Sequence, residues 1–326
     1  MNQAQPKKRI MLVRSSGQNQ ATIDEIMADT PQADYVVVDD NREGVYGSAG
    51  DGINSVIGCP RALMTPELIA LVGPSLQWIH STGAGCENFF FKELVESPLV
   101  LTNGRIIQGP EVADHAFALL LALTRNLHFY LGHRSDKPPR PLELFGKTAV
   151  VFGGGGGIGL LICERAAAFG MKVVAVDDDY VHMTGYISER RTTEYFLDVL
   201  PQADVVLNAA PSTAVSRGTF NRDTFAAMKK GAYFINVSRG SLVVTDDLVA
   251  ALNSGQLTAA GLDVTDPEPL PADHALRTMP NVILTPHIAG LSEFNRQRSL
   301  ELVKRNIRRF VRGLPLFNVV DKQRQY

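Results

Sequence analysis

A run of five glycines, Gly153–Gly157, constrains the fold of this 326-residue chain more than any other feature. The apolar segment Thr148–Phe152 precedes the run and has the composition of a buried strand. A helical pattern follows over Leu160–Phe169 and stops at Gly170, a residue suited to the position after a helix. A strand, a glycine turn and a helix in this order are typical of a dinucleotide-binding unit.

Three of the glycines fit the spacing G-x-G-x-x-G, namely Gly154, Gly156 and Gly159. One glycine makes the tight turn, one lets backbone N–H groups approach a pyrophosphate, and one lets the helix pack closely on the strand. The run also leaves other registers open, through Gly153, Gly155 and Gly157. We choose the first register because Ile158 and Gly159 directly open the helix, whose N-terminus carries partial positive charge for the phosphates.

An acidic residue stands where such a unit needs one. Asp177 follows the strand-like segment Lys172–Val176 and lies 18 residues beyond Gly159. A carboxylate there accepts hydrogen bonds from an adenosine ribose and repels a 2′-phosphate. Asp178 and Asp179 follow, with no arginine next to them in the sequence. The pattern therefore predicts NAD rather than NADP as the cofactor.

Short strand-like runs alternate with helical runs along the whole chain, which indicates an α/β protein with parallel sheets. At about 150 residues per domain, the length corresponds to two domains. In the first block the expected strands are 9–13, 35–38, 55–57, 76–79 and 99–102, and a helix is expected over 67–72. In the second block they are 148–152, 172–176, 203–208, 233–237, 258–263 and 282–285, as in a doubly wound, Rossmann-like sheet.

Five further segments carry expectations. Glu111–Leu131 reads as one long helix, and its apolar run predicts burial between domains or subunits. Asp246–Asn253 reads as a helix with Thr245 as its N-cap. No strand of the second block follows the last helix, about Ser292–Arg312, so this helix is expected to return and pack on the first block. Residues Asn41–Asn54, rich in Gly and Asp, read as a loop, and 133–141 as a connector.

Composition excludes several classes of protein. The longest apolar stretch has eight residues, whereas a membrane span needs about 20. The polar N-terminus has no apolar core of signal-peptide length. Three scattered cysteines argue against a disulfide scaffold or a structural zinc site and fit a reducing cytoplasm. A net charge of −2 shows no nucleic-acid footprint.

Polar side chains follow three late strands of the second block. Arg239 comes after the segment 233–237, Asp263 and Glu268 come at and beyond the end of 258–263, and His287 follows 282–285. Ligands of open α/β sheets bind at the carboxyl ends of the strands, so these side chains are expected at one rim. An arginine binds a carboxylate, a histidine passes a proton, and a glutamate orients the histidine ring. The set suits reversible hydride transfer to a 2-keto acid.

These motifs together resemble those of the D-isomer-specific 2-hydroxyacid dehydrogenases, over nearly the whole chain. The resemblance rests on Gly146–Thr148 with the glycine turn, Phe234–Val243, Gly261–Val264 with Glu268–Pro271, and Thr285–Gly290. It implies that Arg239, Glu268 and His287 are catalytic. It further implies that Asp263 holds the nicotinamide carboxamide, and that Val237, Ala210 and Pro211 contact the cofactor through their backbone.

The resemblance also extends to the first block. The segment Ser81–Asn88 is similar to the family's substrate loop, in which the N–H groups of Ala84 and Gly85 would meet the substrate carboxylate. The implied architecture has two Rossmann-like, doubly wound domains, the first flavodoxin-like and discontinuous. Residues 1–102 and 295–326 would form the substrate domain and 103–294 the NAD-binding domain, in a homodimer built around the helix 111–131.

Some alternatives stay open. Cys86 replaces a common valine in the substrate loop and is either a small buried residue or a reactive thiol. Ser81 stands where the phosphoglycerate branch usually has arginine, which argues against a phosphorylated substrate. The main rival function is an NAD-sensing scaffold similar to corepressors of this fold, and formate oxidation is a second. The sequence does not name the 2-keto acid, for which glyoxylate and hydroxypyruvate are the reference cases.

Overall fold

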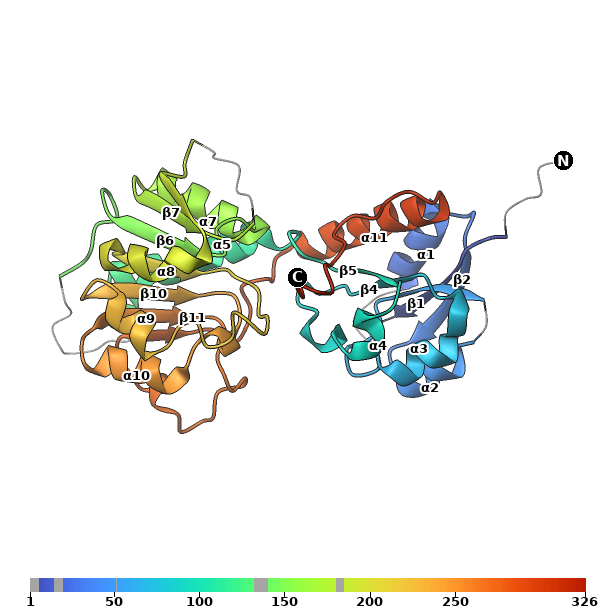
Figure 1. The fold of residues 1–326 in the computed structure, drawn as a ribbon, viewed down its shortest axis with the longest axis horizontal. Helices are drawn as coiled ribbons and strands as arrows, with labels where there is room; N and C mark the ends of the chain where they lie inside the picture. Colours follow the sequence, from blue (N-terminus) through green and yellow to red (C-terminus); the bar gives the residue numbers. More distant parts are fainter. Residues whose placement is uncertain (1–5, 15–19, 51, 132–139, 180–184) are drawn as a thin grey trace. The chain divides into compact units, whose positions relative to one another are not determined.

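The computed structural model describes residues 6–14, 20–50, 52–131, 140–179 and 185–326. The chain forms two compact units, each with its own parallel sheet (Figure 1). Unit 1 comprises Met1–Ile107 and Ser292–Tyr326, and unit 2 comprises Gln108–Leu291. The expected α/β class with two parallel sheets is confirmed. The assignment of the units as substrate domain and NAD-binding domain stays a prediction.

Unit 1 has a five-stranded sheet in the order β2-β1-β3-β4-β5, the flavodoxin-like order. Its strands are β1 (Arg9–Arg14), β2 (Asp34–Asp39), β3 (Ile53–Ile57), β4 (Trp78–His80) and β5 (Val100–Thr102). Its first helices are α1 (Gln20–Asp29), α2 (Arg42–Gly47), α3 (Pro66–Val72) and α4 (Lys92–Val95). Both faces of the sheet are buried, which explains the apolar runs in its strands.

The last helix, α11 (Asn295–Val311), belongs to unit 1. It packs beside α1 and covers one face of the sheet, where Ile307 and Phe310 join the cluster around the fully buried Trp78. The expected return of the chain is therefore confirmed. Gly313, at φ +65°, ends the helix in the left-handed conformation that glycine favours.

Unit 2 has a seven-stranded sheet in the order β12-β11-β10-β9-β6-β7-β8. Its strands are β6 (Thr148–Phe152), β7 (Lys172–Val176), β8 (Glu189–Arg191), β9 (Val205–Asn208), β10 (Ala232–Asn236), β11 (Leu257–Leu262) and β12 (Val282–Leu284). The strand order reverses between β6 and β9, and such a switch point is where open α/β sheets bind ligands.

The helices of unit 2 lie over this sheet (Figure 1). They are α5 (Gly109–Thr124), α6 (Leu127–Leu131), α7 (Gly157–Ala168), α8 (Phe196–Val199), α9 (Arg222–Ala227) and α10 (Thr245–Asn253). Among the described helices none is both long and apolar enough to cross a membrane.

The prediction of a single helix over 111–131 is wrong. The helix breaks after Thr124, and Asn126 adopts φ +58°, a left-handed conformation that asparagine tolerates better than most residues. The apolar face of α5 packs on α7, β10 and β11 of its own unit, so that unit's core already accounts for its composition. Residues 132–139, most of the expected connector, lie outside the described part of the chain.

Two further expectations need correction. Residues 41–54 are not one loop, because Asn41 caps α2 by accepting a hydrogen bond from the Gly44 N–H, and β3 begins at Ile53. Thr245 is the first residue of α10 rather than its N-cap. Its hydroxyl donates instead to the carbonyl oxygen of Asp266, at 2.6 Å. Strand β8, with only three residues, had no recognisable signal in the sequence.

Candidate active and cofactor site

Three adjacent strands present the candidate catalytic residues. Arg239 follows β10, Glu268 follows β11 and His287 follows β12, and these strands are neighbours in the sheet. All three strands run parallel, so their carboxyl ends meet at one rim. The three residues therefore lie on the same edge of the sheet of unit 2, as the rule for strand ends predicts.

Glu268 and His287 form a close pair. Glu268 Oε1 lies 2.6 Å from His287 Nδ1, and the two side chains are 42% and 47% exposed. Because an ionised carboxylate only accepts hydrogen bonds, Nδ1 carries the hydrogen and Nε2 is the atom left to exchange a proton with a ligand. His287 also has φ +54°, a conformation that costs a non-glycine residue free energy and that recurs at functional sites.

Two buried asparagines form a hydrogen-bonded series that ends at the backbone of Arg239. Asn236, the last residue of β10, donates from Nδ2 to the Arg239 carbonyl oxygen at 3.0 Å. Asn208, the last residue of β9, donates to Asn236 Oδ1 at 3.0 Å, and its own Oδ1 accepts from the Ala210 N–H at 3.2 Å. Sequence reasoning missed these two residues, although an amide at the end of each of two apolar strands was a usable signal.

Asp263 lies just beyond β11 and is almost fully buried. Its Oδ1 accepts from the Thr285 hydroxyl at 2.6 Å and from the Ile288 N–H at 2.9 Å. Its Oδ2 accepts from the Ala289 N–H at 2.9 Å. These donors stabilise an ionised carboxylate, which has lone pairs left to accept a hydrogen bond from an amide ligand.

The glycines that the fold of the turn requires differ from those of the expected register. Gly153 has φ +81°, and a Cβ built on it would lie 2.5 Å from the backbone of Ala210. Gly154 and Gly159 leave equally little room, against Ala175 and Gly153. A Cβ on Gly156 would meet only the Gly153 carbonyl oxygen, at 3.6 Å. The fold itself therefore requires Gly153, which the chosen register omits, and does not require Gly156.

The start of α7 suits an anion. Gly156 is its N-cap and supplies no side chain to bond the first N–H groups of the helix, which include those of Gly157, Ile158 and Gly159. The helix runs for twelve residues, and its N-terminus opens at the switch point of the sheet. The turn and the helix end together fit the pyrophosphate of a dinucleotide, because close backbone approach and N–H donors are what such a group needs.

Asp177 contacts the glycine turn directly. Its Oδ2 accepts from the Gly155 N–H at 2.8 Å and its Oδ1 from the Asp179 N–H at 3.0 Å. Burial raises the pKa of Asp177, and these two hydrogen bonds oppose the rise. The unforeseen strand β8 brings arginines beside the acidic segment: the Asp177 N–H donates to the Arg191 carbonyl oxygen, and Arg190 donates to the Asp179 carbonyl oxygen.

The remaining expected cofactor contacts lie on the loops after β9 and β10. Val237 is buried, and its N–H donates to the Asn208 carbonyl oxygen at 3.4 Å. The Ser238 hydroxyl donates to the Ala210 carbonyl oxygen and ties the two loops together. Pro211 is exposed, and its carbonyl oxygen accepts from the Ser216 hydroxyl at 2.7 Å.

The expected substrate loop lies in unit 1, after β4. Asn103 donates to the Ala84 carbonyl oxygen at 2.6 Å, and Arg61 donates to the Gly85 carbonyl oxygen at the same distance. The Gly104 N–H holds the preceding carbonyl, that of Gly83, at 2.9 Å. Donors within unit 1 therefore fix three successive peptide groups of this loop.

Cys86 behaves as a buried apolar side chain. It is 4% exposed, and burial raises the pKa of its thiol to about 11. A thiol with that pKa carries almost no thiolate at neutral pH, so the structure favours the packing role over the reactive one. Cys59 and Cys163 are buried free thiols as well.

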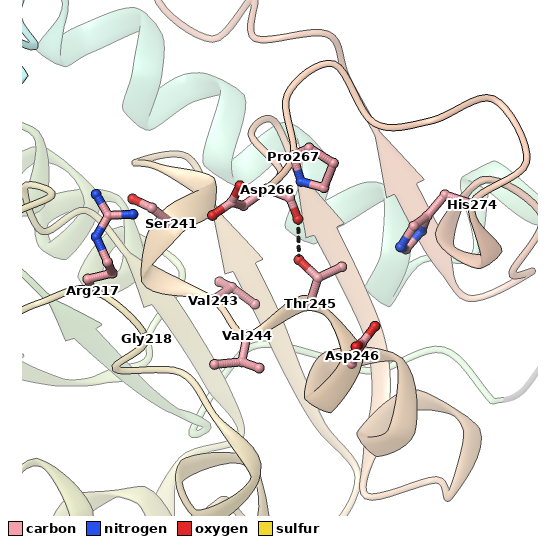
Figure 2. Close-up of a pocket in the computed structure, with 10 residues that line it drawn as sticks. All are labelled: Arg217, Gly218, Ser241, Val243, Val244, Thr245, Asp246, Asp266, Pro267 and His274. Atoms are coloured by element: carbon pink, nitrogen blue, oxygen red, sulfur yellow. Dashed lines mark hydrogen bonds between the residues drawn. The ribbon is translucent and has the colours of Figure 1, made fainter. Parts of the chain in front are cut away.

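Unit 2 also contains a separate cavity. The cavity has a volume of about 420 Å³. Figure 2 shows the residues that line it, with Thr245 and Asp266 joined by the hydrogen bond described above. Its walls include Arg217, Ser241 and His274, whereas Arg239, Glu268 and His287 do not line it. Within the described residues, no group of three or more His, Cys, Asp or Glu side chains is arranged to hold a metal ion.

Comparison with known proteins gives consistent matches. The profile of the family described as D-isomer specific 2-hydroxyacid dehydrogenase, NAD binding domain, matches residues 117–289. A hydroxypyruvate reductase of Blautia hydrogenotrophica is 35% identical over 261 residues, covering 76% of this chain and 80% of that protein. A glyoxylate reductase of Pyrococcus furiosus is 33% identical over 268 residues, covering 77% of each.

A solved structure is similar over nearly the full length. It is a D-isomer specific 2-hydroxyacid dehydrogenase from Xanthobacter autotrophicus Py2 in complex with NADPH and MES. It superposes with a TM-score of 0.83 at 25% identity, covering 97% of this chain and 99% of that one.

Proposed function

Because the chain belongs to the D-isomer specific 2-hydroxyacid dehydrogenase family, we propose that it interconverts a small 2-keto acid and its D-2-hydroxy acid with NAD as the cofactor. The observation that carries the proposal is the pair of Glu268 and His287 at the carboxyl-end rim of unit 2. Glu268 follows β11 and His287 follows β12, and β11 is the neighbour of β10, which precedes Arg239. The hydroxypyruvate and glyoxylate reductases among its relatives support a substrate of two or three carbons.

The residues of unit 2 fit a dinucleotide. The glycine turn and the N-terminus of α7 would hold the pyrophosphate, Asp177 the adenosine ribose and Asp263 the carboxamide. The loops with Ala210, Pro211 and Val237 would line the cofactor between these points. The nicotinamide ring, when bound, supplies or accepts the hydride.

His287 is the proposed acid and base. With Nδ1 bonded to Glu268, its Nε2 would donate a proton to the substrate oxygen during reduction and remove it during oxidation. The Glu268 carboxylate holds the ring in this orientation and stabilises the charged imidazolium. Arg239 would bind the substrate carboxylate through its planar guanidinium.

The preference for NAD rests on Asp177, because a carboxylate at the ribose repels a 2′-phosphate. The NADPH bound to the Xanthobacter protein and the two arginines of β8 make this preference worth a direct measurement. We also propose a homodimer in the cytoplasm. Leu127, Tyr130 and Leu131 of α6 are exposed apolar side chains that a second subunit could cover.

One panel of assays tests the proposal. The purified protein is mixed with NADH or NADPH and with glyoxylate, hydroxypyruvate, pyruvate, a bulkier 2-keto acid, or formate with the oxidised cofactors. We expect NADH oxidation with glyoxylate or hydroxypyruvate. Tight NADH binding without turnover on any substrate would instead identify a corepressor-like scaffold, and formate-dependent reduction of NAD would identify the other rival reaction.

A further inference from the structure

We propose that His115 is a positioning residue for the nicotinamide carboxamide, acting through Thr285 on Asp263. The inference rests on the proposed NAD-dependent function, which gives Asp263 its ligand. His115 lies on α5, a helix whose apolar side chains pack in the core of unit 2.

Three side chains form one hydrogen-bonded series. His115 Nε2 lies 2.8 Å from Thr285 Oγ1, and Thr285 Oγ1 lies 2.6 Å from Asp263 Oδ1. His115 Nε2 is also 3.4 Å from Asp263 Oδ1. The series joins three elements, because His115 is on α5, Thr285 follows β12 and Asp263 follows β11.

The direction of each hydrogen bond follows from valence. The Thr285 hydroxyl has one hydrogen, and it must point to the ionised Asp263, which can only accept. Thr285 Oγ1 must then accept from His115, so the imidazole carries its hydrogen on Nε2. The whole series therefore donates toward Asp263 and keeps this carboxylate an acceptor.

Burial makes the series effective. The side chain of Asp263 is 1% exposed and that of His115 is 19% exposed, so water competes little for these bonds. The Ile288 and Ala289 N–H groups hold the same carboxylate from the backbone. Thr285 is the one of these donors that can rotate, and His115 is the partner that holds its hydroxyl in the productive orientation.

This arrangement predicts an effect confined to one half of the cofactor. Without the Nε2 donor, the Thr285 hydroxyl can turn its hydrogen away, and Asp263 loses a fixed donor and a fixed orientation. Binding of the nicotinamide half should weaken. Binding of the ADP-ribose half should not change, because the glycine turn and Asp177 do not touch this series.

The test compares four variants of the full-length protein. His115→Leu and His115→Asn remove the donor at the Nε2 position, whereas His115→Gln keeps an N–H donor near that position. His128→Leu is the matched control, because His128 of α6 bonds the Ala122 carbonyl oxygen instead. For each variant, Kd is measured for NADH and for ADP-ribose, which lacks the nicotinamide.

We expect the Leu and Asn variants to raise Kd for NADH about tenfold, the upper end of the net contribution of one hydrogen bond, with Kd for ADP-ribose unchanged. The Gln and control variants should bind both ligands like the wild type. His115→Leu should have little further effect in a Thr285→Val background, because both changes break the same series.

The outcomes separate the two proposals. If the wild type binds no NADH, the proposed function fails. If it binds NADH but the Leu and Asn variants leave its Kd unchanged, or weaken NADH and ADP-ribose equally, the positioning role is overturned. The Asn variant keeps the test valid should a leucine at this site prevent folding, since it is polar and smaller.

Discussion

Glu268 Oε1 and His287 Nδ1 lie 2.6 Å apart, although 19 residues separate them in the sequence. The contact depends on the parallel pairing of β11 with β12, which brings the two following loops together. It determines which ring nitrogen of His287 faces a ligand, and this is the chemical premise for the predictions about catalysis.

Replacing His287 should abolish turnover and spare cofactor binding. His287→Ala removes the proposed acid and base, and kcat on the best 2-keto acid should fall by about 10²- to 10⁴-fold. Kd for NADH, measured by fluorescence titration, should stay unchanged. His274→Ala is the control, because His274 lies outside the candidate catalytic set and caps a short turn by accepting from the Leu276 N–H. A His287→Ala enzyme with wild-type kcat would remove this residue from the mechanism.

Arg239 should affect both substrate binding and the chemical step. Arg239→Ala should raise KM for the 2-keto acid and lower kcat, because the proposed role of the guanidinium is to bind the carboxylate in the ground state and in the transition state. Arg239→Lys should recover only part of the loss, since an ammonium lacks the bidentate geometry. Steady-state kinetics on the preferred substrate give both constants. A change in KM alone would limit Arg239 to binding.

Asp177 should control the choice between the two cofactors. Asp177→Ala removes the carboxylate that would repel a 2′-phosphate, and Arg190 and Arg191 lie on the adjacent strand. The ratio of kcat/KM for NADPH to that for NADH should rise at least about tenfold, which corresponds to about 1.4 kcal/mol. Asp178→Ala is the matched control, because Asp178 bonds Thr193 instead. An unchanged ratio would place cofactor discrimination elsewhere.

Alanine should destabilise the protein more at Gly153 than at Gly156 of the turn. Gly153→Ala forces a side chain into a left-handed backbone and against Ala210, and should cost about 1–3 kcal/mol for the backbone conformation alone. Gly156→Ala has room for its Cβ and should cost less than about 1 kcal/mol. Thermal unfolding without cofactor measures both. Equal losses of Tm would contradict the packing of this turn.

His80 should make unit 1 sensitive to acid. Complete burial lowers the pKa of His80 to about 4 from the usual 6.5. The folded state therefore holds neutral histidine, and the stabilisation is complete above pH 6.5. As the pH falls from 6.5 to 4, the unfolded state takes up the proton first, and the free energy of unfolding drops by up to about 3 kcal/mol.

The single tryptophan makes this measurable. Trp78 is fully buried in the same strand, and both Trp78 and His80 bond the Thr102 hydroxyl, so its fluorescence reports the unfolding of unit 1. Urea unfolding is followed at pH 7.5 and pH 5. In His80→Asn, which does not titrate, the difference between the two pH values should shrink. An identical difference in variant and wild type would assign the acid sensitivity to other groups.

The strand positions could be predicted because their signals are local. Buried parallel strands read as short apolar runs, and the rule that ligands lie at carboxyl ends then placed Arg239, Glu268 and His287 on one rim. The two parallel sheets and the return of α11 followed from the same alternation and were confirmed.

The errors share a physical cause, which is that tertiary contacts decided the outcome. Thr245 is of a residue type that suits an N-cap, but its hydroxyl donates instead to the carbonyl oxygen of Asp266, 21 residues away. The run of five glycines left several registers open, because the contact with Ala210 on another loop, which requires Gly153 to lack a Cβ, cannot be read from the sequence. His115 had no motif around it and acquires a role only through Thr285, 170 residues later.

The placement of α11 has a consequence for how the protein is made. Unit 2 is one uninterrupted stretch, so a nascent chain contains all of it before α11 leaves the ribosome. The first five strands are synthesised much earlier, but α1 alone covers only part of the face around Ile10 and Trp78 until Val303, Ile307 and Phe310 arrive. The half of the molecule that is translated first is therefore the half that finishes folding last.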